Sequence, residues 1–418
     1  MLSYQAARAK VIEVIRERCA AASSGSASRS APAVETIDLA AEPARALGRF
    51  LSENIQADRN YPPFHRSARD GFAVHAEEVA QPGAKLRLIG ESRAGVPFDG
   101  ELSRGDCIEI MTGAALPRGA DAVVMLEHVQ VEGNSVRFDR VAQPGQNYVP
   151  EGAEMHAGDP VLRAGTRLGY AELAAAAQVG VALLKMARRP RMAILSTGDE
   201  VTDIGAKPGN FQIRNSNSVS LAAQAALGGG EPVMLGNAAD HAAAIRAKIE
   251  RGLVEDILVL SGGVSAGKHD LVEPVLRELG AEFFFDAVAV RPGRPAVFGW
   301  CRGKPVFGLP GNPVSTMVTF ELFVLPAMEL LSGHSPEALP FFKARLQHAV
   351  DEKPGMAHFL PARVSWPAGE ATVELPRWEG SGDIGSVTRG NCFLVVQEPR
   401  WQMAAGDWAD VLPRRGAF

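Results

Sequence analysis

The chain has 418 residues, and a prior of roughly 150 residues per domain predicts about three domains. Hydrophobic residues make up 46% and charged residues 22%, which is ordinary globular composition and excludes global disorder. The 43 basic and 48 acidic residues leave a formal net charge of −5. Because the chain has no excess of basic charge to bind phosphates, we expect no nucleic-acid partner.

The amino terminus predicts an amphipathic helix rather than a signal peptide, because charges interrupt its apolar positions in MLSYQAARAKVIEVIRER. The most apolar later stretch, residues 171–186, contains Glu172, Gln178 and Lys185 and is shorter than the roughly 20 residues of a membrane span. The cysteines are scattered, without metal or redox spacing, which favours a reducing compartment. They are Cys19, Cys107, Cys301 and Cys392. We expect a cytoplasmic protein with no membrane segment.

The first part of the chain mixes helical and β patterns. Residues 21–33 are small and Ser-rich and predict a flexible loop. Residues 43–55 repeat apolar side chains at helical spacing, which predicts a second helix docked on the first. Short β runs over residues 61–152, with a hairpin at Gly133 and Asn134, predict a small β domain. Residues 169–186 predict a return to helix.

The second part begins with alternating strand and helix patterns from residue 191 to about 333. This alternation predicts a parallel sheet with helices on both faces. From residue 341 onward, short β runs without long helices predict a small antiparallel domain. The expected domains are therefore 1–60 with 153–189, 61–152, 190–334 and 335–418.

Three loops follow the β runs of the expected parallel sheet: STGDE at 196–200, SGGVSAGKHD at 261–270 and LPGNPVS at 309–315. Ligands bind at the carboxyl ends of strands in such sheets, so we expect the loops to open on one crevice. Taken alone, each of these glycine- and proline-rich loops is equally consistent with an ordinary turn that binds no ligand. The hypothesis of a ligand site rests on their convergence.

The chemistry of these loops suits a phosphorylated ligand. Gly262 and Gly263 let backbone N–H groups turn toward an anion, and Asn312 is placed as the N-cap of a helix that begins at Pro313. Acidic residues in the same loops could hold magnesium together with phosphate oxygens, although a lone loop carboxylate is more often solvated. These acids are Asp199, Glu200 and Asp270.

The segment VRPGRP at 290–295 permits two interpretations, a turn with solvated arginines or a site for a tetrahedral oxyanion. The histidines show no HxH or HExxH spacing, so we expect no protein-held zinc or iron. No GxSxG motif follows a strand, which disfavours a serine hydrolase.

Six segments in order resemble the MoeA family of molybdopterin molybdenumtransferases, which includes the carboxyl-terminal domains of gephyrin and of the plant molybdenum-insertion protein. They are SARDGFAV at 67–74, IMTGAALPRGADAVV at 110–124, STGDE, SGGVSAGKHD, FGLPGNPVS and GSGDIGSVTRGN at 380–391. The resemblance runs over nearly the whole chain.

The resemblance implies a fold and an activity. The fold would combine an elongated N-terminal α+β domain, a β-rich insertion domain, a doubly wound parallel α/β domain of the molybdopterin-binding type and a C-terminal β-barrel-like domain. The protein would act as a homodimer with magnesium. It would insert molybdate-derived molybdenum into adenylyl-molybdopterin at the pterin dithiolene and release AMP.

The resemblance also assigns residues to roles. Catalytic positions would be Asp70, Thr112, Glu200 and Asp270, with Asp70 and Thr112 reaching the site of the other subunit. Glu200 and Asp270, helped by Asp240, would bind magnesium, while Arg291, Arg294 and Ser386 would hold molybdate. The remaining substrate-binding residues would be Ser196, Thr197, Gly198, Asp199, Ser261, Gly262, Gly263, Ser265, Pro310, Gly311, Asn312, Pro313 and Ser315.

The sequence departs from the family pattern at a few positions. Arg69 and Phe72 stand where the family usually has Met and Tyr, and Arg291 and Arg294 replace lysines. The segment NYVPEGAE at 147–154 replaces an arginine-rich one.

Two other functions stay open from the sequence: adenylyl transfer to molybdopterin, and a gephyrin-like scaffold. Expected contacts include the molybdopterin adenylyltransferase and apo-molybdoenzymes. The sequence does not separate molybdate from tungstate or identify the receiving apoenzyme.

Overall fold

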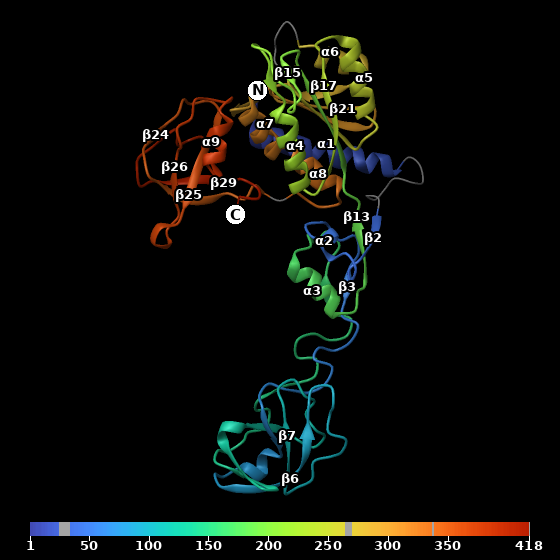
Figure 1. The fold of residues 1–418 in the computed structure, drawn as a ribbon, viewed down its shortest axis with the longest axis vertical. Helices are drawn as coiled ribbons and strands as arrows, with labels where there is room; N and C mark the ends of the chain where they lie inside the picture. The colour runs from blue at the N-terminus through green and yellow to red at the C-terminus, as the bar shows by residue number, and fades with distance from the viewer. Residues whose placement is uncertain (25–33, 264–269, 337, 418) are drawn as a thin grey trace.

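The computed structural model describes residues 1–24, 34–263, 270–336 and 338–417. In Figure 1 an α/β unit and the C-terminal β domain lie side by side at one end of an extended molecule. A β domain occupies the other end, and a slender module that contains α2 and α3 connects the two.

The α/β unit is built on a six-stranded sheet in the order β17-β14-β18-β22-β21-β19. The first four strands are parallel, as predicted, whereas β21 runs antiparallel to both of its neighbours. The strands are β14 (Arg191–Thr197), β17 (Glu231–Ala238), β18 (Ile257–Ser261), β19 (Glu282–Phe285), β21 (Val297–Cys301) and β22 (Lys304–Leu309). The helices are α4 (Ser216–Leu227), α5 (Ala242–Gly252), α6 (Val272–Glu278), α7 (Pro313–Thr319) and α8 (Leu325–Leu331).

Alternation along the central strands explains why both faces of this sheet are covered. Met192 and Ile194 of β14 pack into one core with α4, α7 and α8. Ala193 and Leu195 point to the other face and pack with α5 and α6. Side chains of a strand alternate between the two faces, so a run of apolar residues such as RMAIL requires helices on both.

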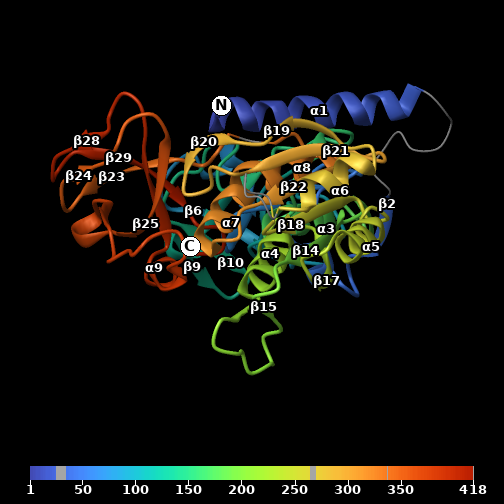
Figure 2. The same ribbon diagram turned by 90° about the horizontal axis from the view of Figure 1, so that it is seen from above.

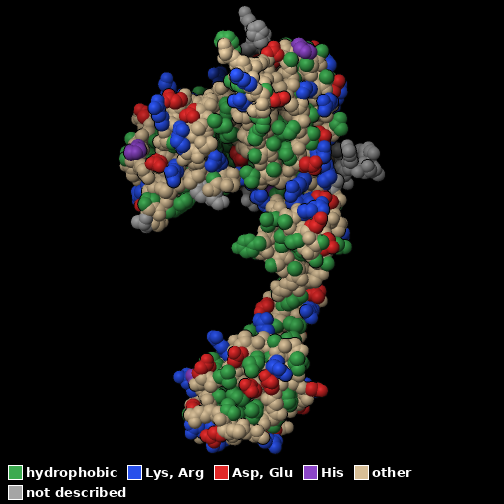
Figure 3. Space-filling view, viewed as in Figure 1, with side chains coloured by type: hydrophobic (Ala, Val, Ile, Leu, Met, Phe, Trp, Pro, Cys, Tyr) green, Lys and Arg blue, Asp and Glu red, His purple; other side chains and the backbone are tan. Residues whose placement is uncertain are grey.

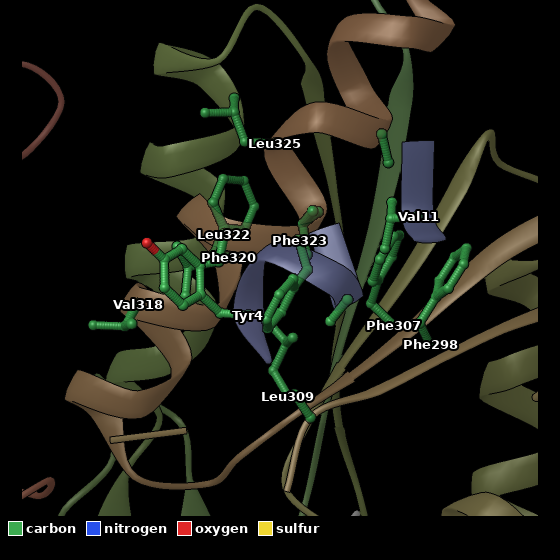
Figure 4. Packing of buried hydrophobic residues seen from close by; sticks show 14 of the residues in the cluster. Tyr4, Val11, Phe298, Phe307, Leu309, Val318, Phe320, Leu322, Phe323 and Leu325 are labelled. Carbon is green, nitrogen blue, oxygen red and sulfur yellow. The ribbon is translucent and has the colours of Figure 1, made fainter. Parts of the chain in front are cut away.

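The first helix, α1 (Tyr4–Ser24), packs on this α/β unit, so the prediction that it docks on the second helix is wrong. Its buried Val11 and Ile15 share a core with Phe298 and Phe323, and Figure 4 shows Val11 close to Phe298 and Phe307. Figure 2 shows α1 lying along one side of the unit. The adjoining strand β1 (Leu2–Ser3) pairs with β20 (Val288–Arg291).

Two further details of this part of the chain differ from the predictions. Helix α1 continues through Ser24, and the rest of the flexible loop expected at 21–33 lies outside the described residues. The helix expected at 43–55 is limited to α2 (Pro43–Ala46), and Ile55–Gln56 is strand β3. Isolated bridges at Phe50 and Leu51 hold the intervening chain extended.

The stretch Pro313–Leu331 is apolar and long enough to cross a membrane, but 72% of it is buried inside the protein. It comprises α7, the π-helical turn η3 (Phe320–Val324) and α8. Phe320, Leu322 and Phe323 are almost fully buried in the core of the α/β unit. This burial is that of a core helix.

The slender module is formed by two segments far apart in the sequence. Strand β2 (Val34–Asp38) pairs with β13 (Leu183–Ala187), and β3 pairs with β12 (Pro160–Leu162). The helix predicted at 169–186 is found only as α3 (Tyr170–Gln178), because the chain then turns at Gly180 into β13. Ile37, Leu51 and Leu184 form the centre of its core.

The β domain contains a six-stranded sheet in the order β8-β5-β7-β6-β10-β9. The predicted hairpin is confirmed, since β9 and β10 pair antiparallel on either side of Gly133 and Asn134. The sheet strands are β5 (Gly71–Val74), β6 (Ala84–Ser92), β7 (Asp106–Ile110), β8 (Ala122–Met125), β9 (Val129–Glu132) and β10 (Ser135–Phe138). Outside the sheet lie the pair β4 (Arg66–Ser67) and β11 (Tyr148–Val149) and the short helices η1 (Ala76–Val79) and η2 (Leu126–His128).

The C-terminal domain is a closed barrel, as the resemblance implied. Its strands follow the ring β25-β26-β23-β29-β27, and pairing of β27 with β25 closes it. All of these pairs are antiparallel except β23 with β26. The elements are β23 (Phe342–Leu346), β25 (Ala357–Ser365), β26 (Thr372–Glu374), β27 (Cys392–Val396), β29 (Trp408–Pro413), the pair β24 (Val350–Asp351) and β28 (Gln402–Met403), and the helices η4 (Pro367–Gly369) and α9 (Ile384–Arg389).

Candidate active site

A cleft of about 690 Å³ opens at the carboxyl ends of β14, β18 and β22. The three loops predicted to converge do line it, together with the start of α4 and two residues of the C-terminal domain. The lining residues are Ser196, Thr197, Gly198, Glu200, Val201, Ile213, Arg214, Asn215, Ser216, Asn217, Asp240, Ser261, Gly262, Gly263, Asp270, Pro295, Pro310, Gly311, Asn312, Pro313, Gly382 and Ile384. The convergence is therefore confirmed, whereas Ser265 lies outside the described residues.

Asn217 ties two of these loops together. Its Nδ2 donates hydrogen bonds of 2.8 Å to the Ser261 hydroxyl and of 2.8 Å to the Gly311 carbonyl. Its Oδ1 is buried and has no hydrogen-bond partner among the described residues. None of the three loop motifs contains this residue. The available signal was Asn215 ahead of the helix pattern SVSLAAQAAL, since Asn215 caps α4 by accepting from the Ser218 N–H at 3.1 Å.

The glycine turn after β18 has the conformation expected of an anion-binding loop. Gly262 and Gly263 have φ of 90° and 64°, the left-handed region that favours glycine. A Cβ at Gly263 would lie 2.7 Å from the Thr197 Oγ1. That hydroxyl is itself buried and unpartnered within the described structure. The close packing leaves room for backbone only.

The acidic residues divide into two groups. Glu200, Asp240 and Asp270 line the cleft. Asp199 does not, because its Oδ1 accepts a hydrogen bond of 3.0 Å from the Asp240 N–H while Asp240 Oδ2 accepts from the Asp199 N–H at 3.3 Å. The described residues contain no group of three His, Cys, Asp or Glu side chains arranged to hold a metal by themselves.

The set of oxygen groups in the cleft nevertheless fits magnesium. This ion is usually held by one or two carboxylates, several waters and the phosphates of a substrate rather than by a complete protein cage. The cleft presents three carboxylates beside a glycine turn, which are the kinds of group that such a site uses.

The LPGNPVS loop is anchored to the C-terminal domain. Asn312 occupies the N-cap position of α7, but its side chain does not cap the helix as predicted. Instead its Nδ2 donates to the Ser381 hydroxyl at 2.8 Å, and the Val314 N–H donates to the Ser381 carbonyl at 3.0 Å. Ser315 is buried and does not line the cleft.

The three residues expected to hold molybdate lie outside the lining of this cleft. Arg291 is half-exposed and lies 3.9 Å from the Glu352 carboxylate, and Arg294 is exposed. Ser386 is fully buried in α9, where its hydroxyl donates to the Asp383 carbonyl at 2.6 Å. Of the VRPGRP turn, only Pro295 lines the cleft.

Asp70 and Thr112 lie together in the β domain, beyond the slender module from the cleft of their own chain (Figure 1). The Asp70 carboxylate accepts a hydrogen bond of 2.6 Å from the Thr112 N–H. Hydrogen bonds from the Thr112 backbone and hydroxyl hold the pKa of Asp70 below its usual value. Both residues are exposed.

A second cavity, of about 380 Å³, lies where the slender module, the α/β unit and the C-terminal tail meet. Both of its acidic side chains face Arg415, which lies 3.7 Å from Glu321 and 3.9 Å from Glu329. Burial raises the pKa of Glu329, and Arg415 opposes that shift. These contacts indicate a structural junction between modules.

The fold and the cleft together define a multidomain α/β protein with a polar crevice at its strand ends. Models of known families match three consecutive parts of it: the MoeA N-terminal region (domain I and II) at residues 2–180, a probable molybdopterin binding domain at 193–330 and the MoeA C-terminal region (domain IV) at 343–413. The chain belongs to the MoeA family of molybdopterin molybdenumtransferases.

Individual relatives agree along most of the chain. The molybdopterin molybdenumtransferase of Haemophilus influenzae is 32% identical over 375 residues, 88% of this chain and 92% of its own length. That of Bacillus subtilis is 33% identical over 84% of each chain. The structure of the molybdopterin biosynthesis MoeA protein from Pyrococcus horikoshii OT3 aligns with a TM-score of 0.77 and 28% identity, over 99% of this chain and 100% of its own.

Proposed function

We propose that this chain is a molybdopterin molybdenumtransferase, an enzyme that transfers molybdenum from molybdate to adenylyl-molybdopterin and releases AMP. The observation that carries this proposal is the convergence of the three strand-end loops on one cleft lined by three carboxylates and a glycine turn. Family membership supports the same reaction class. Neither alternative function, adenylyl transfer or scaffolding, has an observation of its own in its favour.

Substrate binding would use the groups that the cleft presents. The N–H groups around Gly262 and Gly263 would bind the phosphoanhydride, and Asn217 would hold the Ser261 and Gly311 loops at a fixed separation. Positioning of this kind accelerates a reaction by removing the entropy cost of aligning the reacting groups. Pro310 and Pro313 would shape the wall nearest the C-terminal domain.

Magnesium is the expected cofactor, and Glu200, Asp270 and Asp240 are the residues that would hold it. When bound, it would neutralise charge on the phosphate oxygens as the anhydride opens. Oriented backbone N–H groups of the cleft would contribute to the same stabilisation. Molybdate is a substrate in this scheme, with Arg291 and Arg294 as its proposed binding residues. Ser386 is not among them, because it is fully buried and its hydroxyl donates to the Asp383 carbonyl. Since Arg291 lies 3.9 Å from Glu352 and its strand β20 pairs with β25, the oxyanion would approach from the side of the C-terminal domain.

The active unit would be a homodimer in which Asp70 and Thr112 of one chain complete the cleft of the other. Two observations support this arrangement. The pair lies beyond the slender module from its own cleft (Figure 1), and Figure 3 shows apolar side chains gathered on the exposed face around α4. Val219 and Leu227 of α4 are about half exposed, and Tyr170 of α3 is 87% exposed. Exposed apolar surface of this extent commonly marks a protein interface.

The proposal extends to location and partners. The four cysteines are all free thiols, which suits a reducing cytoplasm. The molybdopterin adenylyltransferase that makes the substrate and the apo-molybdoenzymes that receive the product are the expected protein partners.

One assay tests the function and separates it from the alternatives. Purified protein is mixed with adenylyl-molybdopterin, magnesium and either molybdate or tungstate, and AMP release and metal transfer are measured. We expect both to depend on the oxyanion. A parallel reaction with ATP and molybdopterin should give no adenylated product. If the protein adenylated molybdopterin from ATP but did not turn over adenylyl-molybdopterin, its function would be adenylyl transfer and the proposal would be wrong.

A further inference from the structure

Arg214 is the one basic side chain among the described residues that line the cleft. The other charged groups in that lining are the carboxylates of Glu200, Asp240 and Asp270. None of the sequence motifs described above contains Arg214. An arginine within an otherwise acidic cleft is either paired with those acids or available to a ligand.

Arg214 has no side-chain partner among the described residues. Its side chain is exposed, and it forms no ion pair or hydrogen bond with any part of the chain that the structure describes. Arg191 of the same α/β unit, in contrast, contacts both Glu231 and Glu255. The acids of the cleft therefore leave the Arg214 guanidinium uncompensated.

The backbone that carries Arg214 is held on both sides. Strands β15 (Val201–Thr202) and β16 (Ile213–Arg214) pair in parallel, with Thr202 opposite Arg214. The Ile213 N–H donates to the Glu200 carbonyl at 2.8 Å, and the Asn215 N–H donates to the Thr202 carbonyl at 2.9 Å. The side chain therefore starts from a fixed point at the edge of the cleft.

Two other anion-binding features share this cleft. Helix α4 begins at Ser216, directly after the Asn215 cap, and Ser216 and Asn217 line the cleft with Arg214. The glycine turn at Gly262 and Gly263 also lines it. Helix N-termini and such turns favour phosphate, and an arginine fork adds paired, charge-assisted hydrogen bonds to phosphate oxygens.

We propose that Arg214 binds the adenylate phosphate of the substrate and retains it in AMP. This inference rests on the proposed function and names a residue for it. The guanidinium would hold the phosphate from the β16 side of the cleft, opposite the loops that follow β18 and β22. Molybdate would still bind at Arg291 and Arg294. Loss of Arg214 should therefore weaken AMP binding and leave the dependence of turnover on molybdate concentration unchanged.

The test measures AMP affinity by isothermal titration calorimetry on the full-length protein with magnesium present. Arg214→Ala should raise the Kd for AMP about tenfold or more, the loss expected for one or two charge-assisted hydrogen bonds. The Kd for AMP of Arg214→Lys should lie between those of Arg214→Ala and the wild type, because lysine keeps the positive charge but lacks the planar guanidinium that forms paired hydrogen bonds. Arg251→Ala, which removes an exposed arginine from the end of α5, is the matched control and should bind like the wild type.

Turnover provides the second measurement. The KM for adenylyl-molybdopterin should rise in Arg214→Ala while the half-saturating molybdate concentration stays the same. An AMP Kd within twofold of the wild type, no AMP binding by the wild type, or a shift confined to molybdate would each overturn the inference. A protein that binds AMP through Arg214 but releases none from the adenylate would support the inference while overturning the proposed function.

Discussion

The Asp70 carboxylate accepts a 2.6 Å hydrogen bond from the Thr112 N–H, which joins two sequence signatures 42 residues apart in the β domain. The bond stabilises the ionised carboxylate and lowers its pKa. Because the folded pKa lies below the unfolded one, the contribution to stability is complete above the ordinary carboxyl pKa of about 3.9 and is lost as pH falls through the lower folded value.

We therefore expect the pKa of the Asp70 carboxyl in the folded protein to lie below its ordinary value. Carbon-detected NMR of the side chain against pH is the measurement. In Thr112→Pro, which lacks the backbone N–H, the pKa of Asp70 should move back toward its ordinary value. An unshifted wild-type titration would show that the hydrogen bond is not formed in solution.

The composite site gives a complementation prediction. Asp70→Ala and Asp270→Ala homodimers should each lose most AMP release, because each would lack one residue in both sites. Mixing them after subunit exchange should restore activity, since one site per heterodimer then has both residues. Size-exclusion chromatography with differently tagged subunits verifies exchange. Exchange without recovery would argue that each chain works alone.

The glycine turn gives a prediction with a matched control. Gly263→Ala should cost about 1–2 kcal/mol for the left-handed backbone, and its Cβ would also meet Thr197 Oγ1 at 2.7 Å and Val272 Cγ2 at 2.9 Å. Gly280 has φ of 86° but open space around it, so Gly280→Ala should show the backbone cost alone. AMP affinity should fall only in Gly263→Ala. Equal AMP affinity in the two variants would contradict an anion-binding role for the turn.

The two arginines of the VRPGRP turn should differ in their contribution to molybdate binding. Arg294 has no ion-pair partner among the described residues, whereas Arg291 shares its charge with Glu352 at 3.9 Å. Arg294→Ala should raise the half-saturating molybdate concentration about tenfold or more, and Arg291→Ala less. Replacing both with lysine should have a modest effect, since charge is retained. Molybdate titration of AMP release measures all three variants, and unchanged dependence in both Ala variants would place the oxyanion elsewhere.

The position of α1 gives a stability prediction. Ile15 is fully buried in the core of the α/β unit, so Ile15→Ala should cost about 2–5 kcal/mol in the free energy of unfolding. Glu17→Ala, on the exposed face of the same helix, should change stability by less than about 0.5 kcal/mol. Urea unfolding followed by circular dichroism tests the pair. Equal stability of the two variants would mean that α1 does not belong to this core.

Much of the site could be predicted from the sequence, because its position follows from the pattern of short segments that form strands and the loops after them. An apolar run such as RMAIL predicts a strand buried on both faces, and the residues directly after parallel strands meet at one sheet edge. These rules located Glu200, Gly262 and Pro310 in the cleft. The family resemblance rested on the same local segments.

Other features were decided by contacts between distant segments, which local patterns do not contain. The apolar face of α1 does not specify which surface the helix packs against. Only the assembled fold places it against Phe298. Arg214 looks like one exposed arginine among many until the β15–β16 pairing sets it at the cleft. Ser386 lies in a family signature, yet the packing of α9 buries it. The sequence by itself determined which strands and loops form, while tertiary packing decided which side chains reach the cleft, because that depends on contacts between segments that are not neighbours in the sequence.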